Sequence, residues 1–120
     1  MITGHVNQDY EAIIPIRLVG LVDDIKVAID TGFNGDICLR KDLSEELKLD
    51  PIAIEDYELG DGNITQVEVF SGKIIWFDEE RVVDLIFTRS EQSLIGTGLL
   101  TRCRLEINYH NGEVFIQRIP

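Results

Sequence analysis

The sequence predicts an all-β protein, a small closed or partly closed antiparallel barrel with one or two short helices. Short aliphatic segments recur along the 120 residues and are separated by turn-forming residues. Two of the turns, Gly60-Asp61-Gly62-Asn63 and Asn111-Gly112, are strong hairpin signals, because glycine and asparagine accept positive φ angles. A chain of this length forms one domain, 1–120, with a single core.

The first two predicted strands span 12–19 and 25–30. Pro15 lies within the first of them, and proline cannot donate a hydrogen bond to a neighbouring strand. We therefore expect this strand to be an edge strand or to contain a bulge. The second strand is apolar in character, which predicts burial on both of its faces.

A short strand at 37–39 leads into the clearest helix start of the sequence. Asp42 is followed three residues later by Glu45, which is the spacing of a capping box. Asp50-Pro51 ends this helix, because the residue before a proline disfavours helical backbone angles.

The second half of the chain consists of hairpins and brief strands. Apolar and polar residues alternate over 105–109, which predicts a half-buried strand. Leu99, Leu100 and Cys103 lie at helical spacing, which predicts a short helix within 97–103. The remaining strands are expected at 52–59, 64–70, 73–77, 81–87, 94–95 and 114–116, with a turn at 78–80.

Composition narrows the classes of partner. Twenty-two acidic and eleven basic residues give a net charge of −11, which would repel nucleic acid and an anionic membrane surface. No apolar run is long enough to span a membrane, and the first residues lack the pattern of a secretory signal. We therefore expect a cytoplasmic protein in which Cys38 and Cys103 are reduced.

One triplet, Asp30-Thr31-Gly32, carries the clearest chemical signal. An aspartate that a strand delivers into a turn of small residues is held rigidly near backbone amides, as an acid–base carboxylate requires. Taken alone, the triplet also fits an ordinary turn at the end of a strand. Chemistry with paired carboxylates needs two such groups, so a second copy of the chain would have to supply the other.

A second pattern, Leu94-Ile95-Gly96-Thr97-Gly98, follows the triplet, and a hairpin with the tip Gly60-Asp61-Gly62 lies between them. This ordered set resembles the retropepsin-like aspartic proteases, the single-domain family that includes the retroviral proteases. It is most similar to bacterial and archaeal members with an Asp-Thr-Gly-Phe-Asn-Gly loop. The resemblance extends over nearly the whole chain, from about residue 14 to residue 116.

The resemblance implies a catalytic role for the triplet. Asp30 matches the catalytic aspartate, and Thr31 matches the threonine whose hydroxyl grips the partner subunit beneath the active site. Gly32 matches the glycine whose backbone approaches the substrate. Two Asp30 carboxylates, one per subunit, would then share a proton and activate a water.

The resemblance also implies a set of substrate-binding residues. The Gly60-Asp61-Gly62 tip matches the flap that closes over a peptide, and Ile95 belongs to the segment packed beside the catalytic loop. Phe33 stands where retroviral enzymes have a small residue, so it narrows the cleft or fills a specificity pocket. Asn34 replaces an aspartate that holds the substrate backbone. The substrate-binding set is therefore Phe33, Asn34, Gly60, Asp61, Gly62 and Ile95.

These observations favour a homodimeric aspartic endopeptidase that acts on a peptide or protein substrate without a metal or cofactor. His5 and His110 have no spaced partners suited to a zinc site. One alternative is a catalytically inactive dimeric β domain that binds an extended peptide or a partner protein. Another is a monomer with a structural role.

Overall fold

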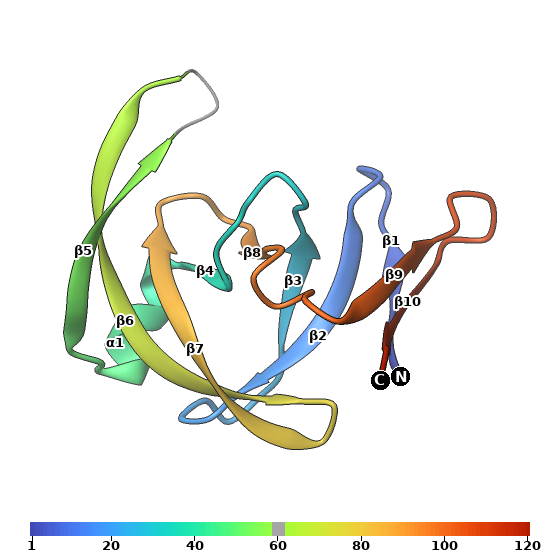
Figure 1. Cartoon of the computed structure of the whole chain (residues 1–120), viewed down its shortest axis with the longest axis horizontal. Helices are drawn as coiled ribbons and strands as arrows, with labels where there is room; N and C mark the ends of the chain where they lie inside the picture. The colour runs from blue at the N-terminus through green and yellow to red at the C-terminus, as the bar shows by residue number, and fades with distance from the viewer. Residues whose placement is uncertain (59–61) are drawn as a thin grey trace.

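Ten β-strands and one single-turn α-helix form the described part of the chain, residues 1–58 and 62–120, in a computed structural model (Figure 1). A 3₁₀ turn at Lys41–Leu43 leads into the helix, α1 (Ser44–Leu47). The strands are β1 (Ile2–Val6), β2 (Ala12–Leu18), β3 (Ile25–Ile29), β4 (Ile37–Arg40), β5 (Pro51–Glu58), β6 (Ile64–Trp76), β7 (Glu79–Thr88), β8 (Ser93–Ile95), β9 (Cys103–Ile107) and β10 (Glu113–Arg118).

All ten strands belong to one sheet, in the order β5-β6-β7-β4-β8-β3-β2-β1-β10-β9. An additional pairing of β2 with β6 closes a ring of hydrogen bonds through six strands, β2, β3, β8, β4, β7 and β6. The all-β prediction is thus confirmed. Most pairings are antiparallel, and two that the sequence did not indicate, β3 with β8 and β4 with β7, are parallel.

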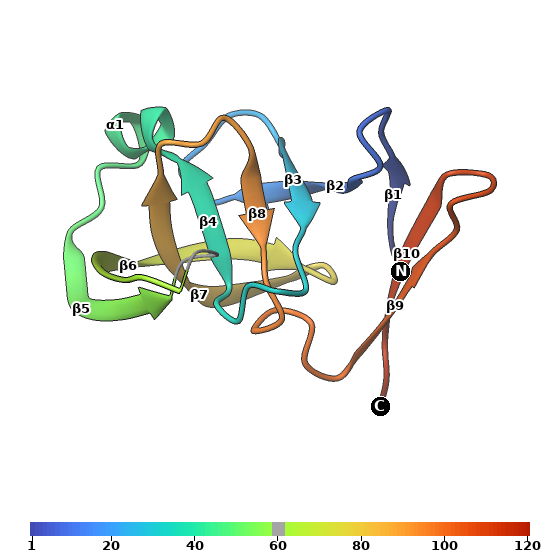
Figure 2. The same ribbon diagram turned by 90° about the horizontal axis from the view of Figure 1, so that it is seen from above.

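Two extensions leave this ring in different directions. The β5–β6 hairpin extends on one side, and β1, β10 and β9 continue the sheet on the other (Figures 1 and 2). No helix in the described residues is long and apolar enough to cross a membrane.

The core lies inside the ring and draws aliphatic side chains from nearly every strand. Burying each such side chain contributes about 1.5–3 kcal/mol, so this cluster is the main source of stability. Its completely buried members include Ile14, Val27, Ile37, Leu39, Ile74, Leu85, Ile95, Leu99 and Ile116. This core fixes the ends of β3 and β8, from which the candidate site is built.

The expectation that Pro15 marks an edge or a bulge is wrong. β2 is an inner strand, and Pro15 pairs in register with Lys26 of β3. On the other flank of β2, pairing with β1 ends at Ile13 and pairing with β6 begins only at Arg17. Proline is tolerated because no neighbouring strand pairs with this side of β2 between Ile13 and Arg17, so the missing N–H breaks no hydrogen bond between strands.

The predicted break near residues 71–72 is absent, because β6 runs continuously through Gly72. A Cβ atom at Gly72 would lie 2.5 Å from Cδ1 of Leu85, so this glycine allows close packing. The turn expected at 78–80 lies one residue earlier. Phe77 and Asp78 form the two-residue connection between β6 and β7, both with positive φ.

The helices are shorter than the sequence predicts. The 3₁₀ turn and α1 begin without a side-chain cap, so the capping box of Asp42 and Glu45 does not form. Two turns within residues 97–102, with hydrogen bonds such as Leu100 N–H to the Thr97 carbonyl at 3.0 Å, stand in place of the expected helix. The sequence analysis also missed β1, whose polar alternation gave little strand signal.

Candidate active site

Asp30 follows β3 directly, and three hydrogen bonds fix its loop. Its N–H donates to the carbonyl of Ile95 at 2.9 Å, and its own carbonyl accepts from the N–H of Phe33 at 3.1 Å. One carboxylate oxygen, Oδ1, accepts from the N–H of Gly32 at 2.9 Å. The side chain remains partly exposed. The loop therefore presents a positioned carboxylate with a second oxygen available for chemistry.

The two sequence patterns meet at this point. Three successive N–H groups after β8 donate to carbonyl groups of the Asp30 loop at 2.8–3.1 Å, so one segment clamps the other. The Thr97 hydroxyl also donates to the Phe33 carbonyl at 3.3 Å. The backbone pairs are Gly96 to Asp36, Thr97 to Phe33 and Gly98 to Gly35.

Position 96 requires glycine, because the segment after β8 and the Asp30 loop are in close contact there. A Cβ atom there would lie 2.5 Å from the Phe33 carbonyl oxygen and closer still to that of Gly35. Gly98 is similarly confined, because its Cβ would lie 2.5 Å from Oδ1 of Asp36. Glycine therefore permits the backbone approach that orders the Asp30 loop.

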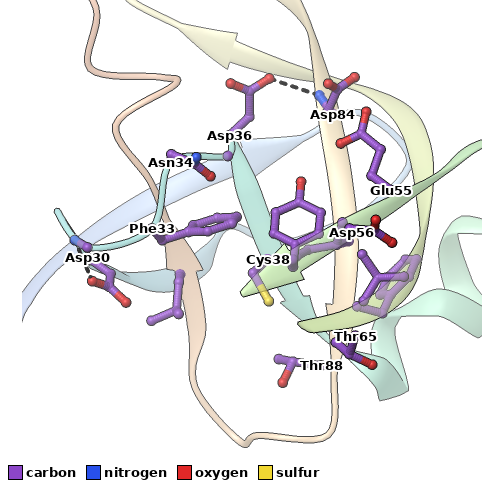
Figure 3. A pocket seen from close by; sticks show the side chains of 17 residues that line it. Asp30, Phe33, Asn34, Asp36, Cys38, Glu55, Asp56, Thr65, Asp84 and Thr88 are labelled. Carbon is purple, nitrogen blue, oxygen red and sulfur yellow. Dashed lines mark hydrogen bonds between the residues drawn. The ribbon is translucent and has the colours of Figure 1, made fainter. Parts of the chain in front are cut away.

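A groove of about 1150 Å³ extends from Asp30 to the β5–β6 hairpin (Figure 3). Its walls come from the Asp30 loop, the hairpin, β4, β7 and β8. The lining residues are Asp30, Gly32, Phe33, Asn34, Gly35, Asp36, Cys38, Glu55, Asp56, Tyr57, Thr65, Val67, Asp84, Ile86, Phe87, Thr88 and Leu94. This volume is sufficient for several side chains of an extended peptide.

The groove lining includes Asp30 and Gly32 of the triplet and Phe33, which follows it. Asn34 lines it as well. Thr31 is exposed on the single chain and lies outside the groove lining.

The other predicted substrate-binding residues are placed differently. Ile95 is completely buried in the core and supports the loop through its carbonyl, while its neighbour Leu94 lines the groove. Gly62 has a positive φ of 84° and does not line the groove. Gly60 and Asp61 lie outside the described residues.

Phe33 forms a wall of the groove without filling it. Its ring packs over Gly35, where a Cβ atom would lie 2.5 Å from Cζ of Phe33. It also faces the ring of Tyr57, with centroids 6.2 Å apart and planes tilted by 41°. Phe33 therefore contributes an aromatic surface to the groove that Asp30 also lines.

Sequence reasoning missed the wall that the β5–β6 hairpin supplies. Cross-strand pairing joins Glu55 to Val67 and Tyr57 to Thr65, so these four residues share the face that lines the groove. The only signal in the sequence was that successive side chains of the predicted strand 52–59 point to opposite faces. This alternation did not reveal which face of the hairpin lies toward Asp30, because that depends on how the hairpin bends over the ring of strands.

The groove is strongly acidic. Its lining contains five carboxylates and no lysine or arginine, and none of the ion pairs found among the described residues involves these carboxylates. The pKa of Tyr57 is raised by burial, by the charges of Glu55, Asp84 and Asp36, and by a hydrogen bond with Glu55. In the described part of the chain, no group of three His, Cys, Asp or Glu side chains is arranged to hold a metal ion.

Cys38 lies in the groove wall, and burial raises the pKa of its thiol to about 11. At pH 9 an ordinary thiol of pKa 9.0 is half ionised, whereas Cys38 would be about 1% thiolate, so we expect roughly fifty-fold slower alkylation. Iodoacetamide labelling at pH 9, read at Cys38 by mass spectrometry, measures this rate. The urea-unfolded chain is the reference, and equal rates in both states would contradict the assignment.

No protein-family model matches the sequence, and no curated protein matches it. Solved structures do match the fold. A retropepsin-like aspartic protease from Rickettsia conorii aligns with a TM-score of 0.72 and 20% identity, over 96% of this chain and 88% of the other.

A simian foamy virus protease aligns with a TM-score of 0.56 and 13% identity. That alignment covers 74% of this chain and 91% of the viral one. At these identities the similarity is one of architecture. The chain therefore has the fold of the retropepsin-like aspartic proteases.

Proposed function

We propose that this protein is a homodimeric aspartic endopeptidase in which each subunit contributes one Asp30. The observation that carries the proposal is the position of the Asp30 carboxylate. It lies at the edge of a groove of about 1150 Å³, on a loop clamped by backbone hydrogen bonds, within a retropepsin-like fold. A groove of this kind can hold an extended peptide beneath the β5–β6 hairpin.

The chemistry follows from bringing two like charges together. Two Asp30 carboxylates that face each other across a twofold axis cannot both ionise readily, so the pair holds one proton. The ionised member takes a proton from a water molecule as that water attacks the scissile carbonyl. The protonated member donates to the carbonyl oxygen. Because this mechanism needs one protonated and one ionised carboxyl group, we expect an acidic optimum.

Assembly of two copies is supported by the form of the single chain. Asp30 is partly exposed on the single chain and lines the groove, so its carboxylate is accessible to a second subunit. β9 is the last strand of the sheet, and its outer edge has no partner strand among the described residues. Such an edge pairs readily with another copy. The net charge of −11 opposes association at neutral pH and is reduced by mild acid.

A dimeric domain that binds an extended peptide without cleaving it is the second candidate. The observation that favours it is Phe33, a bulky residue of the Asp30 loop whose ring lines the groove and faces Tyr57. In that case a peptide would bind along the hairpin while its backbone stayed away from the carboxylates.

Cleavage of a peptide library between pH 3 and pH 8, combined with sedimentation velocity at the same pH values, separates these functions. We expect cleavage that is greatest at acidic pH, together with a dimer. Peptide binding by a dimer without cleavage at any pH would favour the binding domain. A monomer at every pH and concentration would contradict both.

A further inference from the structure

The groove contains a side-chain pocket of mixed character. One part is apolar, where Phe33, Tyr57, Val67 and Leu94 pack around the buried side chains of Cys38, Val69 and Ile86. All of these except Val69 line the groove. An apolar wall of this kind holds the aliphatic part of a ligand side chain.

Carboxylates gather at one end of this wall. Figure 3 shows Asp36, Asp84 and Glu55 together at that end, away from Asp30. One oxygen of Asp36 accepts from the N–H of Asp84 at 2.9 Å, which fixes the distance between β7 and the Asp30 loop. Tyr57 joins the two parts, because its ring belongs to the wall, while burial and the charges of Glu55 and Asp84 raise the pKa of its hydroxyl group.

We propose that this pocket selects a lysine or arginine side chain of the bound peptide, an inference that rests on the proposed peptide-binding function. Lysine and arginine have an aliphatic stem that packs on apolar surface and a cationic end that requires anionic partners. The wall formed by Phe33, Tyr57 and Leu94 matches the stem. The carboxylates of Glu55, Asp84 and Asp36 match the charge.

The alternatives fit the pocket less well. An acidic side chain would be repelled by the three carboxylates, and a neutral aliphatic chain would leave them without a cationic partner. Because the described ion pairs do not involve these carboxylates, an incoming cation does not have to displace one from the protein. The selectivity is therefore a property of the pocket, in addition to the general attraction of a protein with a charge of −11.

Binding of labelled peptides to the Asp30→Asn protein tests the inference independently of cleavage. One lysine is moved along an otherwise constant ten-residue peptide, and each peptide is paired with a version containing norleucine, which keeps the stem and removes the charge. At one position we expect lysine to bind about fivefold more tightly than norleucine, measured by fluorescence anisotropy.

Two double variants of the Asp30→Asn protein locate the effect. Glu55→Gln with Asp84→Asn should abolish the preference for lysine. Glu68→Gln with Glu80→Gln removes the same charge from exposed positions outside the groove and should preserve it. A lysine preference that is absent, equal at all positions, or reduced equally by both double variants would overturn the proposal. Selective binding of lysine peptides without any cleavage by the wild-type protein would support the proposed pocket and contradict the proposed endopeptidase function.

Discussion

Asp30→Asn is expected to reduce peptide cleavage by about 10³-fold or more while leaving the fold intact. Asparagine cannot take a proton from water, and general acid–base groups contribute about 10²- to 10⁴-fold to such reactions. Because the variant changes both halves of the proposed pair, neither the base nor the acid remains. The loss is measured as the cleavage rate of each protein at a saturating concentration of a library peptide that the wild-type protein cleaves.

The geometry makes asparagine a conservative replacement at this position. The carbonyl oxygen of its side chain can still accept from the N–H of Gly32, as Oδ1 of Asp30 does at 2.9 Å. We therefore expect the free energy of unfolding to change by less than about 1 kcal/mol. Glu68→Gln is the matched control, an exposed carboxylate on the opposite face of the hairpin, and should cleave normally. Cleavage by Asp30→Asn at the wild-type rate would remove Asp30 from the mechanism.

Gly96→Ala is expected to have the largest effect on stability. The new methyl group would lie 2.5 Å from the Phe33 carbonyl oxygen, and both neighbours in closest contact are backbone oxygens that cannot rotate away. Displacing Gly96 would also disturb its hydrogen bond to the Asp36 carbonyl. We expect a loss of about 3 kcal/mol or more in the free energy of unfolding, measured by urea denaturation.

Gly62→Ala provides the comparison for the same change in side chain. No atom of the described residues lies within 4 Å of a Cβ built at Gly62, whose positive φ of 84° opposes alanine. That strain costs about 1–2 kcal/mol. A Gly96→Ala protein that is as stable as Gly62→Ala would show that the clamp on the Asp30 loop is not tightly packed.

Much of the fold could be predicted because local patterns and packing agree. Aliphatic segments bounded by glycine, asparagine or aspartate became strands, as at 12–18, 25–29 and 113–118. The Asp30 loop and the Gly96 segment were predicted to lie together, and backbone hydrogen bonds join them. That contact was inferred from the resemblance to a family and not from spacing, since Gly96 lies 66 positions after Asp30 in the chain.

The remaining features depend on contacts that local patterns do not contain. Gly72 resembled a strand break, but it lies within β6 and leaves room for the side chain of Leu85. Leu99 had helical spacing, yet the hydrogen bonds that clamp the Asp30 loop hold the segment after β8 in successive turns. Glu55 and Tyr57 gave no sign of their role, because the bend of a long hairpin brings them to the groove.

Subunit mixing tests the central claim, that each active centre needs Asp30 from two chains. Wild-type and Asp30→Asn chains are unfolded together, refolded at a fixed total concentration and assayed for peptide cleavage. If every centre requires two aspartates, activity follows the square of the wild-type fraction, so an equal mixture keeps about a quarter of the wild-type rate. Retention of about half, a linear dependence on the wild-type fraction, would show that one chain is sufficient and would contradict the account.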